Sequence, residues 1–327
     1  MDIHDFRSNP LPDSIINALL SATQAYTEVN VLLREYADFM PLLSDILLVL
    51  DVYYLNYNSH PEVENIYRAL YIPDNTNKFN KEVSSFTNCV AYAKKKVIST
   101  EVLTAGDILM INATIKAGYA ELVLPDKTII KNENLIDPVW SILYDLYNPK
   151  PQYSLLLETA IACYRFLIFS EAESFSMQTL IILFSTVIKN ECIFYGFTRQ
   201  WVLFTDPRVN LSSLGIIHAI EHILSVFQGM WEYSIKLLRT LINHRNDILY
   251  RINEILPNRA STDIVRILSE SLYIRRKQIS DKLMISPNTI TKILKQLEQK
   301  KILTAEKYWR EVYYFNNLLM EKINDQK

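Results

Sequence analysis

Residues 155–169 read LLLETAIACYRFLIF, and this run decides the fold that the sequence predicts. It contains neither Gly nor Pro, and apolar side chains cover almost every face of a helix wound through it, which predicts a helix buried on all sides. A second apolar run, from Met177 to Ile188, follows the polar stretch Ser170 to Ser174. The two runs predict a pair of central helices, joined by a short loop, around which the other elements pack.

A membrane hairpin is the alternative interpretation of these two runs. Each run is shorter than the roughly 18–20 apolar residues that a membrane-spanning helix needs, and Glu158 and Arg165 interrupt the first. The opening residues, MDIHDFR, lack the basic start and apolar run of a signal peptide. Three cysteines without metal-type spacing, Cys89, Cys163 and Cys192, fit core thiols in a reducing compartment. We therefore expect a cytoplasmic protein with no membrane partner.

Composition predicts a mainly α protein of more than one domain. The chain has 327 residues, 49% of them hydrophobic, and only five glycines. A formal net charge of −2 argues against a protein that coats nucleic acid along its whole length. We expect an N-terminal helical region over residues 1–95, a helical core over 96–256 and a C-terminal domain over 257–327.

The C-terminal domain has the most specific pattern in the chain. Residues 261–316 hold eleven Lys and Arg against six Asp and Glu, a net +5. A helix around residues 264–268 and a second over 278–283 precede Ser286-Pro287, an N-cap followed by a proline that suits the first helical turn. A helix with apolar spacing i, i+3, i+4, i+7 follows, formed by Ile290, Ile293, Leu294 and Leu297. A strand, a turn over 307–310 and the strand 312–315 complete the pattern of a winged helix-turn-helix domain.

The outward face of the third helix supplies candidate DNA-binding residues. They are Asn288, Thr289, Thr291, Lys292, Lys295 and Gln299, with Tyr308 and Arg310 on the wing. Such side chains contact phosphates and base edges when a recognition helix lies in the major groove. The alternative is that they only solubilise a domain used for protein contact or homodimerisation.

The central helix pair resembles the core of the Fic (Fic/Doc, Fido-fold) family, in the bacterial type that carries a C-terminal winged helix. The resemblance rests on the run ACYRF at residues 162–166 and on the C-terminal run LKQLEQKKILTAEKYWREVYYFN. It implies a Fic-like helical domain with a small β-hairpin flap, followed by the winged-helix domain. Members of this family transfer AMP from ATP to protein hydroxyls with Mg²⁺ bound, so the resemblance implies ATP and Mg²⁺ as cofactors if the activity survives.

The catalytic loop departs from the family pattern. The family has His-Pro-Phe and then Gly-Asn-Gly-Arg after the first helix, whereas Ser170 and Glu171 stand here where His and Pro would be, followed by Glu173 and Ser174. No Gly occurs between Gly118 and Gly196, and a phosphate cradle needs inward-facing N–H groups that glycine permits. We therefore expect that AMP transfer is lost and that no catalytic residue or metal ligand can be assigned.

Two further segments are candidates for Fic elements. Glu64-Asn65 matches the end of the family's inhibitory helix, although His60 replaces its hydroxyl residue; the alternative is a plain capping box formed by Ser59 and Glu62. A hairpin is predicted over residues 120–130, after a helix over 100–117 that Gly118 ends. In the family this hairpin is a flap that holds a target protein by strand addition, here through Leu122, Val123, Leu124 and Ile129. A surface hairpin without a partner is the alternative.

The remaining segments predict helices. Asp13 caps a helix with the apolar stripe Ile15, Ile16, Ala18, Leu19 and Ala22, and a second runs from Leu42 to Tyr57. Asp137-Pro138 opens a helix through Tyr147, and two more run from about Ser212 to Leu256. The spacing of His218, Glu221 and His222 matches an inverted zinc-protease motif. A third ligand is not evident, so two histidines on an amphipathic helix is the preferred interpretation.

Three functions stay in contention from the sequence. The first is a Fic-fold protein without AMP transfer that acts as a regulatory or binding module through its winged-helix domain. The second is an active protein adenylyltransferase with a divergent loop, in which Glu171 or Glu173 holds a metal. The third is a winged-helix transcription regulator whose helical domain senses a ligand.

Overall fold

The computed structural model describes residues 10–55, 62–71, 78–100, 102–118, 133–147, 154–173, 176, 178–179, 182–183, 215–254, 258–308 and 311–324. These residues are mostly helical, with a small three-stranded antiparallel sheet, which confirms the mainly α prediction. The chain divides into two compact units, residues 1–28 with 51–232 and residues 29–50 with 233–327. Within the described ranges, no helix has both the length and the apolar composition needed to cross a membrane.

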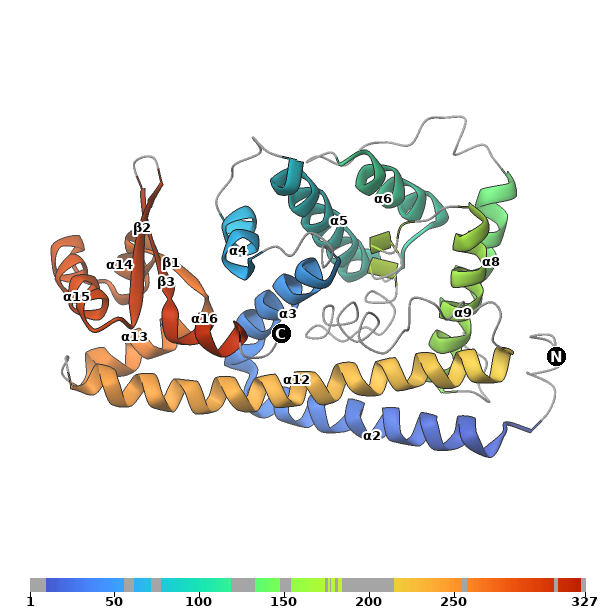
Figure 1. Ribbon diagram of the computed structural model, residues 1–327, viewed down its shortest axis with the longest axis horizontal. Coiled ribbons are helices and arrows are strands. Elements are labelled where there is room, and N and C mark those ends of the chain that lie inside the picture. The colour runs from blue at the N-terminus through green and yellow to red at the C-terminus, as the bar shows by residue number, and fades with distance from the viewer. Residues whose placement is uncertain are drawn as a thin grey trace. The chain divides into compact units, whose positions relative to one another are not determined.

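The described part of the first unit is built from helices (Figure 1). Neighbours in sequence pack against each other in turn: α4 on α5, α5 on α6, α6 on α8, and α8 on α9. The helices and their bounds are α4 Val63–Tyr71, α5 Lys78–Thr100, α6 Ala105–Ala117, α8 Glu133–Tyr147 and α9 Leu155–Glu173, with parts of α2 Asp13–Glu35, α3 Met40–Leu55 and α12 Ile216–Asn253.

Helix α9 is the buried helix that its sequence predicts, but its end differs from the prediction. Almost every residue from Leu156 to Leu167 is buried, including Thr159 and Glu158. The prediction of a loop from Ser170 was wrong, because α9 continues to Glu173. The extra residues contain no Gly or Pro, and Ala and Glu are strong helix formers, so the local sequence extends the helix.

Helix α6 owes its start to a cap that the sequence analysis missed. Helix α5 ends at Thr100 and α6 begins at Ala105, so the helix predicted over 100–117 is confirmed from Ala105 to Ala117 and its predicted start at Thr100 was wrong. Thr104 Oγ1 accepts from the Asp107 N–H at 3.2 Å, and the Asp107 carboxylate accepts from the Thr104 N–H at 2.8 Å. Such a capping box satisfies two backbone donors at a helix start. Gly118 ends α6 in the left-handed region at φ 63°, as predicted.

Three other expectations need correction. Helix α8 begins at Glu133 and encloses Pro138 rather than starting at it. Pro138 is the sixth residue of the helix, so its missing N–H removes a single hydrogen bond to the carbonyl four residues earlier. Helix α12 is one helix of 38 residues, not two. The buried Phe227, Met230 and Trp231 flank Gly229, and this packing outweighs the roughly 1 kcal/mol propensity cost of a glycine. Ile16, expected in the core, is 40% exposed.

The second unit contains the three-stranded sheet, which has the order β1-β3-β2 (Figure 1). Strand β3 is central and pairs antiparallel with both neighbours, Ile274 of β1 and Ala305 of β2 lying opposite Tyr314. The elements are α13 Asn258–Glu270, β1 Tyr273–Arg275, α14 Arg276–Leu283, α15 Pro287–Gln299, β2 Leu303–Tyr308, β3 Glu311–Asn316 and α16 Asn317–Asn324. Strand β1 and helix α16 were not predicted.

The helices and the sheet of the second unit share one apolar core. Buried residues from α13, β1, α14, α15 and β2 form a continuous cluster that also takes in Ile248 and Ile252 of α12. A separate contact in the same unit lies near the start of α3. There Arg245 of α12 forms an ion pair with Asp38, and its guanidinium lies 4.5 Å above the centroid of the Phe39 ring. The core therefore positions α14, α15 and the β2–β3 pair as one body.

Candidate nucleic-acid interface

Helix α15 begins at a complete N-terminal cap. Ser286 Oγ accepts a hydrogen bond from the Thr289 N–H at 3.3 Å, and Pro287 occupies the first helical position. Both features satisfy or avoid the unpaired N–H groups of a helix start. The stripe Ile290, Ile293, Leu294 and Leu297 is buried. The predicted cap, start and apolar face of this helix are all confirmed.

The opposite face of α15 is exposed and polar. Asn288, Thr289, Lys292, Lys295 and Gln299 are all exposed. Their spacing places them along one side of the helix, because residues three, four and seven apart share a helix face. The two lysines therefore lie one turn apart beside the amide and hydroxyl groups of the helix start.

Thr291 differs from the other candidates. It is half-buried, and its hydroxyl donates to the Pro287 carbonyl at 2.8 Å. Arg276 of α14 donates to Thr291 Oγ1 at 3.4 Å. Thr291 therefore lies at the contact between α14 and α15, and its neighbour Arg276 presents the charge at that edge.

Arg276 belongs to a basic run that the sequence analysis did not select. Arg275, Arg276 and Lys277 are consecutive, exposed and placed at the start of α14. Positive side chains at a helix N-terminus oppose the helix dipole, at a cost of roughly 0.3–1 kcal/mol each. Three adjacent basic residues before a predicted helix are the signal that would have found them.

The end of α15 carries further positive charge in an unusual backbone conformation. Ile302 N donates to Leu297 O and Lys301 N donates to Glu298 O, both at 2.9 Å, which is the pairing of a Schellman motif. Lys301 therefore occupies the position that normally holds glycine, with φ 56°. Ile302 and Leu297 are both buried, which gives the apolar contact that accompanies the motif.

The turn between α14 and α15 has a second left-handed residue. Met284 caps the end of α14 at φ 53°, and its side chain is 94% exposed. Ser280 Oγ donates to the Ile285 carbonyl at 2.8 Å across this turn. The turn holds α14 and α15 as neighbours and leaves the Met284 side chain pointing to solvent.

The β2–β3 pair places charged groups beside β1. Arg275 of β1 pairs with Glu311 of β3 at 3.1 Å, and the Tyr313 hydroxyl donates to the same carboxylate at 3.0 Å. Burial raises the pKa of Tyr273, whose ring stacks on Tyr313 at 4.9 Å. Lys307 is exposed near the end of β2. Of the predicted wing residues, Tyr308 lies in β2, and Arg310 is outside the described residues.

Of the Fic-derived candidates, the described residues place one group on α9 and another on α4. Ser170, Glu171 and Glu173 lie in the last turn of α9, whereas Ser174 and the flap residues Leu122, Val123, Leu124 and Ile129 fall outside the described residues. On α4, Glu64 and Asn65 are exposed, and the Glu64 carboxylate pairs with Arg68 at 3.1 Å. Helix α4 begins at Val63, so Glu62 precedes the helix rather than completing a capping box within it.

The histidine motif lies on α12. His218 is exposed, whereas His222 is half-buried and burial lowers its pKa. No group of three or more His, Cys, Asp or Glu side chains in the described ranges could hold a metal ion. The cysteines Cys89 and Cys163 are buried, and burial raises the pKa of both thiols, that of Cys89 to about 12. They behave as core residues, as predicted.

Among the candidates that the structure describes, those on the exposed side of α14 and α15 lie on neighbouring elements. Cations and hydrogen-bond donors in this arrangement suit phosphate oxygens and base edges. Comparison of the chain with protein-family models and with curated proteins gave no match in either case.

Proposed function

We propose that residues 258–324 form a winged helix-turn-helix domain that binds double-stranded DNA, in a regulatory protein without AMP transfer. The single observation that carries the proposal is the exposed polar face of α15, capped at its start and held against α14. In this arrangement α14 and α15 are the two helices of the helix-turn-helix, and the β2–β3 pair is the wing.

Each part of the interface has a role in the proposed complex. Asn288 and Thr289, at the start of α15, reach base edges in the major groove, where an Asn side chain suits adenine. Lys292 and Lys295 contact phosphates, which fixes register and supplies the salt-dependent part of the affinity. Arg276 adds a phosphate contact from α14.

The absence of AMP transfer is supported by the end of α9. Ser170 stands where the resemblance places a general base, and a serine hydroxyl does not accept a proton near neutral pH as imidazole does. The continuation of α9 to Glu173 also uses its N–H groups within the helix, so they do not form a phosphate cradle. Incubation with labelled ATP and Mg²⁺ or Mn²⁺ in a lysate tests this point, and label that depends on the protein would contradict it.

DNA binding is tested by fluorescence anisotropy with mixed-sequence duplexes at two salt concentrations. We expect affinity to fall steeply with salt, because neutralised phosphates release condensed counterions. Lys292→Ala and Lys295→Ala should each weaken binding and lower the salt slope by about one. The matched control is Arg266→Ala, which removes the same charge from an exposed position on α13.

Stability must be measured on the same variants. Exposed substitutions usually change it by no more than about 0.5 kcal/mol, so the lysine variants and Arg266→Ala should unfold like the wild type. Protein that binds no duplex even at low salt would refute the proposal. The α15 face would then be better interpreted as a dimerisation or partner surface.

A further inference from the structure

The first unit contains a cavity that the DNA-binding proposal does not use. It has a volume of about 240 Å³ and is lined by residues of α3, α5, α6 and the segment after α9. Binding sites for drug-sized ligands measure roughly 300–1,000 Å³. The cavity therefore suits a smaller molecule. The lining residues that matter here are Val52, Glu82, Val83, Phe86, Lys116 and Ser176.

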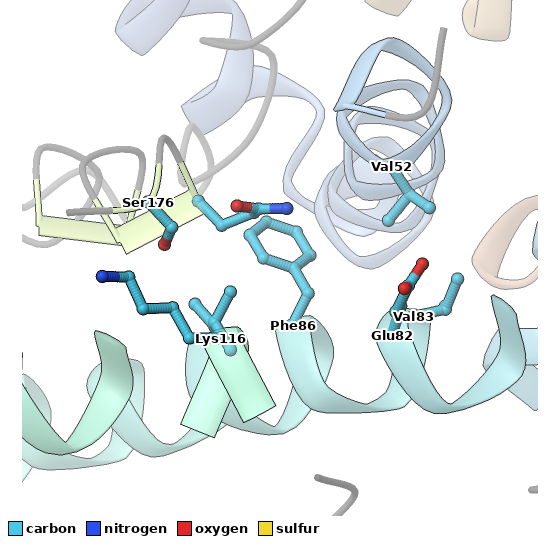
Figure 2. Close-up of a pocket in the computed structure, with 8 residues that line it drawn as sticks. Val52, Glu82, Val83, Phe86, Lys116 and Ser176 are labelled. Carbon is cyan, nitrogen blue, oxygen red and sulfur yellow. The ribbon is translucent and has the colours of Figure 1, made fainter. Parts of the chain in front are cut away.

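Opposite charges line the cavity on either side of an aromatic ring. Figure 2 shows the Phe86 ring in the middle, with Lys116 and Ser176 on one side and Glu82 on the other. Lys116 comes from the last turn of α6 and Glu82 from α5. The cavity therefore offers a cation at one end, an anion at the other end and apolar surface between them.

The positive end is built on a fixed backbone. Ser176 N donates to Asn112 Oδ1 at 3.0 Å, and Thr179 Oγ1 donates to the same oxygen at 3.1 Å. Asn112 is itself buried in α6. These bonds hold the Ser176 hydroxyl beside the helix that carries Lys116. In the described ranges, Lys116 has no carboxylate partner, so its ammonium is available to an anionic group.

The negative end and the middle complete the arrangement. Glu82 pairs with Lys78 at 3.6 Å, but both side chains are exposed, and exposed pairs of this kind contribute little. The Glu82 carboxylate can therefore exchange Lys78 for the cationic group of a ligand. Val52, Val83 and Phe86 are buried to 4% exposure or less and form a rigid apolar wall.

We infer that this cavity binds a small amino carboxylate whose carboxylate and ammonium groups are separated by an apolar chain. Lys116 holds the carboxylate, Glu82 holds the ammonium, and the methylene chain lies against Phe86. The Ser176 hydroxyl is already bonded to Thr179, whose Oγ1 lies 2.8 Å away and whose N–H donates to it at 3.2 Å. An α-amino acid with a short side chain fits less well, because both of its charges sit on one carbon atom and Phe86 separates the two ends of the cavity. The inference does not rest on DNA binding.

Isothermal titration calorimetry of the full chain tests the inference with three matched probes. They are ε-aminocaproate, which has both charged groups, caproate, which lacks the ammonium, and n-hexylamine, which lacks the carboxylate. We expect ε-aminocaproate to bind and each one-charge probe to bind at least about tenfold more weakly, since each lost charge-assisted contact is worth about that factor.

Variants assign the two ends. Lys116→Gln should reduce ε-aminocaproate to the affinity of n-hexylamine, and Glu82→Gln should reduce it to that of caproate. Lys81→Gln is the matched control, because Lys81 is exposed on α5 and does not line the cavity; it should bind as the wild type does. Thermal unfolding of each variant establishes that the unit is intact.

Three results would overturn the inference. They are no heat of binding for ε-aminocaproate at millimolar concentration, equal binding of the three probes, and unchanged binding by a folded Lys116→Gln variant. The first means that the cavity takes no such ligand. Equal binding of the three probes means that the charged ends of the cavity do not discriminate between ligands with one charge and with two. Unchanged binding by Lys116→Gln means that Lys116 does not hold the carboxylate.

Discussion

Lowering the pH from 7 to 5 should destabilise the second unit through His244, a residue of α12. The side chain is 5% exposed, and its Nε2 has no hydrogen-bond partner among the described residues. Burial lowers the pKa of His244 to about 4. Asp247 and Asn316 raise this pKa, whereas Lys322 and Arg251 lower it further.

The sign and size of the effect follow from proton linkage. The unfolded chain binds the proton with a pKa of about 6.5, and the folded unit does so only near pH 4. Stability is therefore complete above the unfolded pKa and falls as the pH drops through the window from about 6.5 to 4. At pH 5 the loss is about 2 kcal/mol, rising to about 3 kcal/mol at the lower end of the window.

Urea unfolding at pH 7 and pH 5 measures this loss when it is followed by hydrogen exchange of peptides from residues 287–324. Between pH 7 and pH 5 the wild type should lose about 2 kcal/mol more unfolding free energy than His244→Gln, because glutamine does not titrate. His218→Gln is the control, since His218 is an exposed histidine on the same helix. A His244→Gln variant that loses as much stability as the wild type between the two pH values would refute the reasoning.

Three further substitutions have defined expectations. Lys301→Gly should raise the unfolding free energy of the second unit by about 1 kcal/mol by relieving the left-handed backbone, whereas Lys301→Ala should not; equal midpoints in urea for the two variants would count against this. Thr104→Ala should lower the stability of the first unit by about 1 kcal/mol through loss of the α6 cap, and Thr104→Ser should restore it, as judged by thermal unfolding. Leu297→Ala should cost about 2–5 kcal/mol in urea unfolding because it empties a fully buried position, and a loss below 1 kcal/mol would show that the site collapses around the smaller residue.

Local signals account for the elements that the sequence predicts well. Ser286 and Pro287 mark the start of α15, and four apolar residues at helical spacing mark its buried face, so cap and periodicity agree. Gly118 likewise marks the end of α6. The polar face of α15 follows from the same periodicity, since the residues that are not in the core must face away from it.

The features that could not be predicted from the sequence depend on contacts between residues far apart in the chain. Strand β1 has three residues and exists because Tyr273, Ile274 and Arg275 pair with β3 some forty residues later. The contact between Arg276 and Thr291 joins two helices and has no sequence signature of its own. The cavity beside Phe86 likewise combines residues from four separate stretches, so no spacing along the chain could have indicated it.

Loops expected from composition were also misjudged where helix formers continued. Three of residues 170–173 are polar, and polarity alone favoured a loop, but α9 extends through them because Ala and Glu carry little helix penalty. Gly229 lies inside α12, because the buried side chains around it hold both halves in one helix.

The order of strands in the small sheet has a consequence for synthesis. The central strand, β3, is the last of the three to leave the ribosome, so β1 and β2 have no strand to pair with until residues 311–316 are made. The second unit also takes residues 29–50 from early in the chain, with residues 51–232 made in between. At roughly 5–20 residues per second, the early segment waits on the order of ten to forty seconds for its partners. A nascent chain stalled before residue 311 would therefore hold β1 and β2 without the strand that joins them.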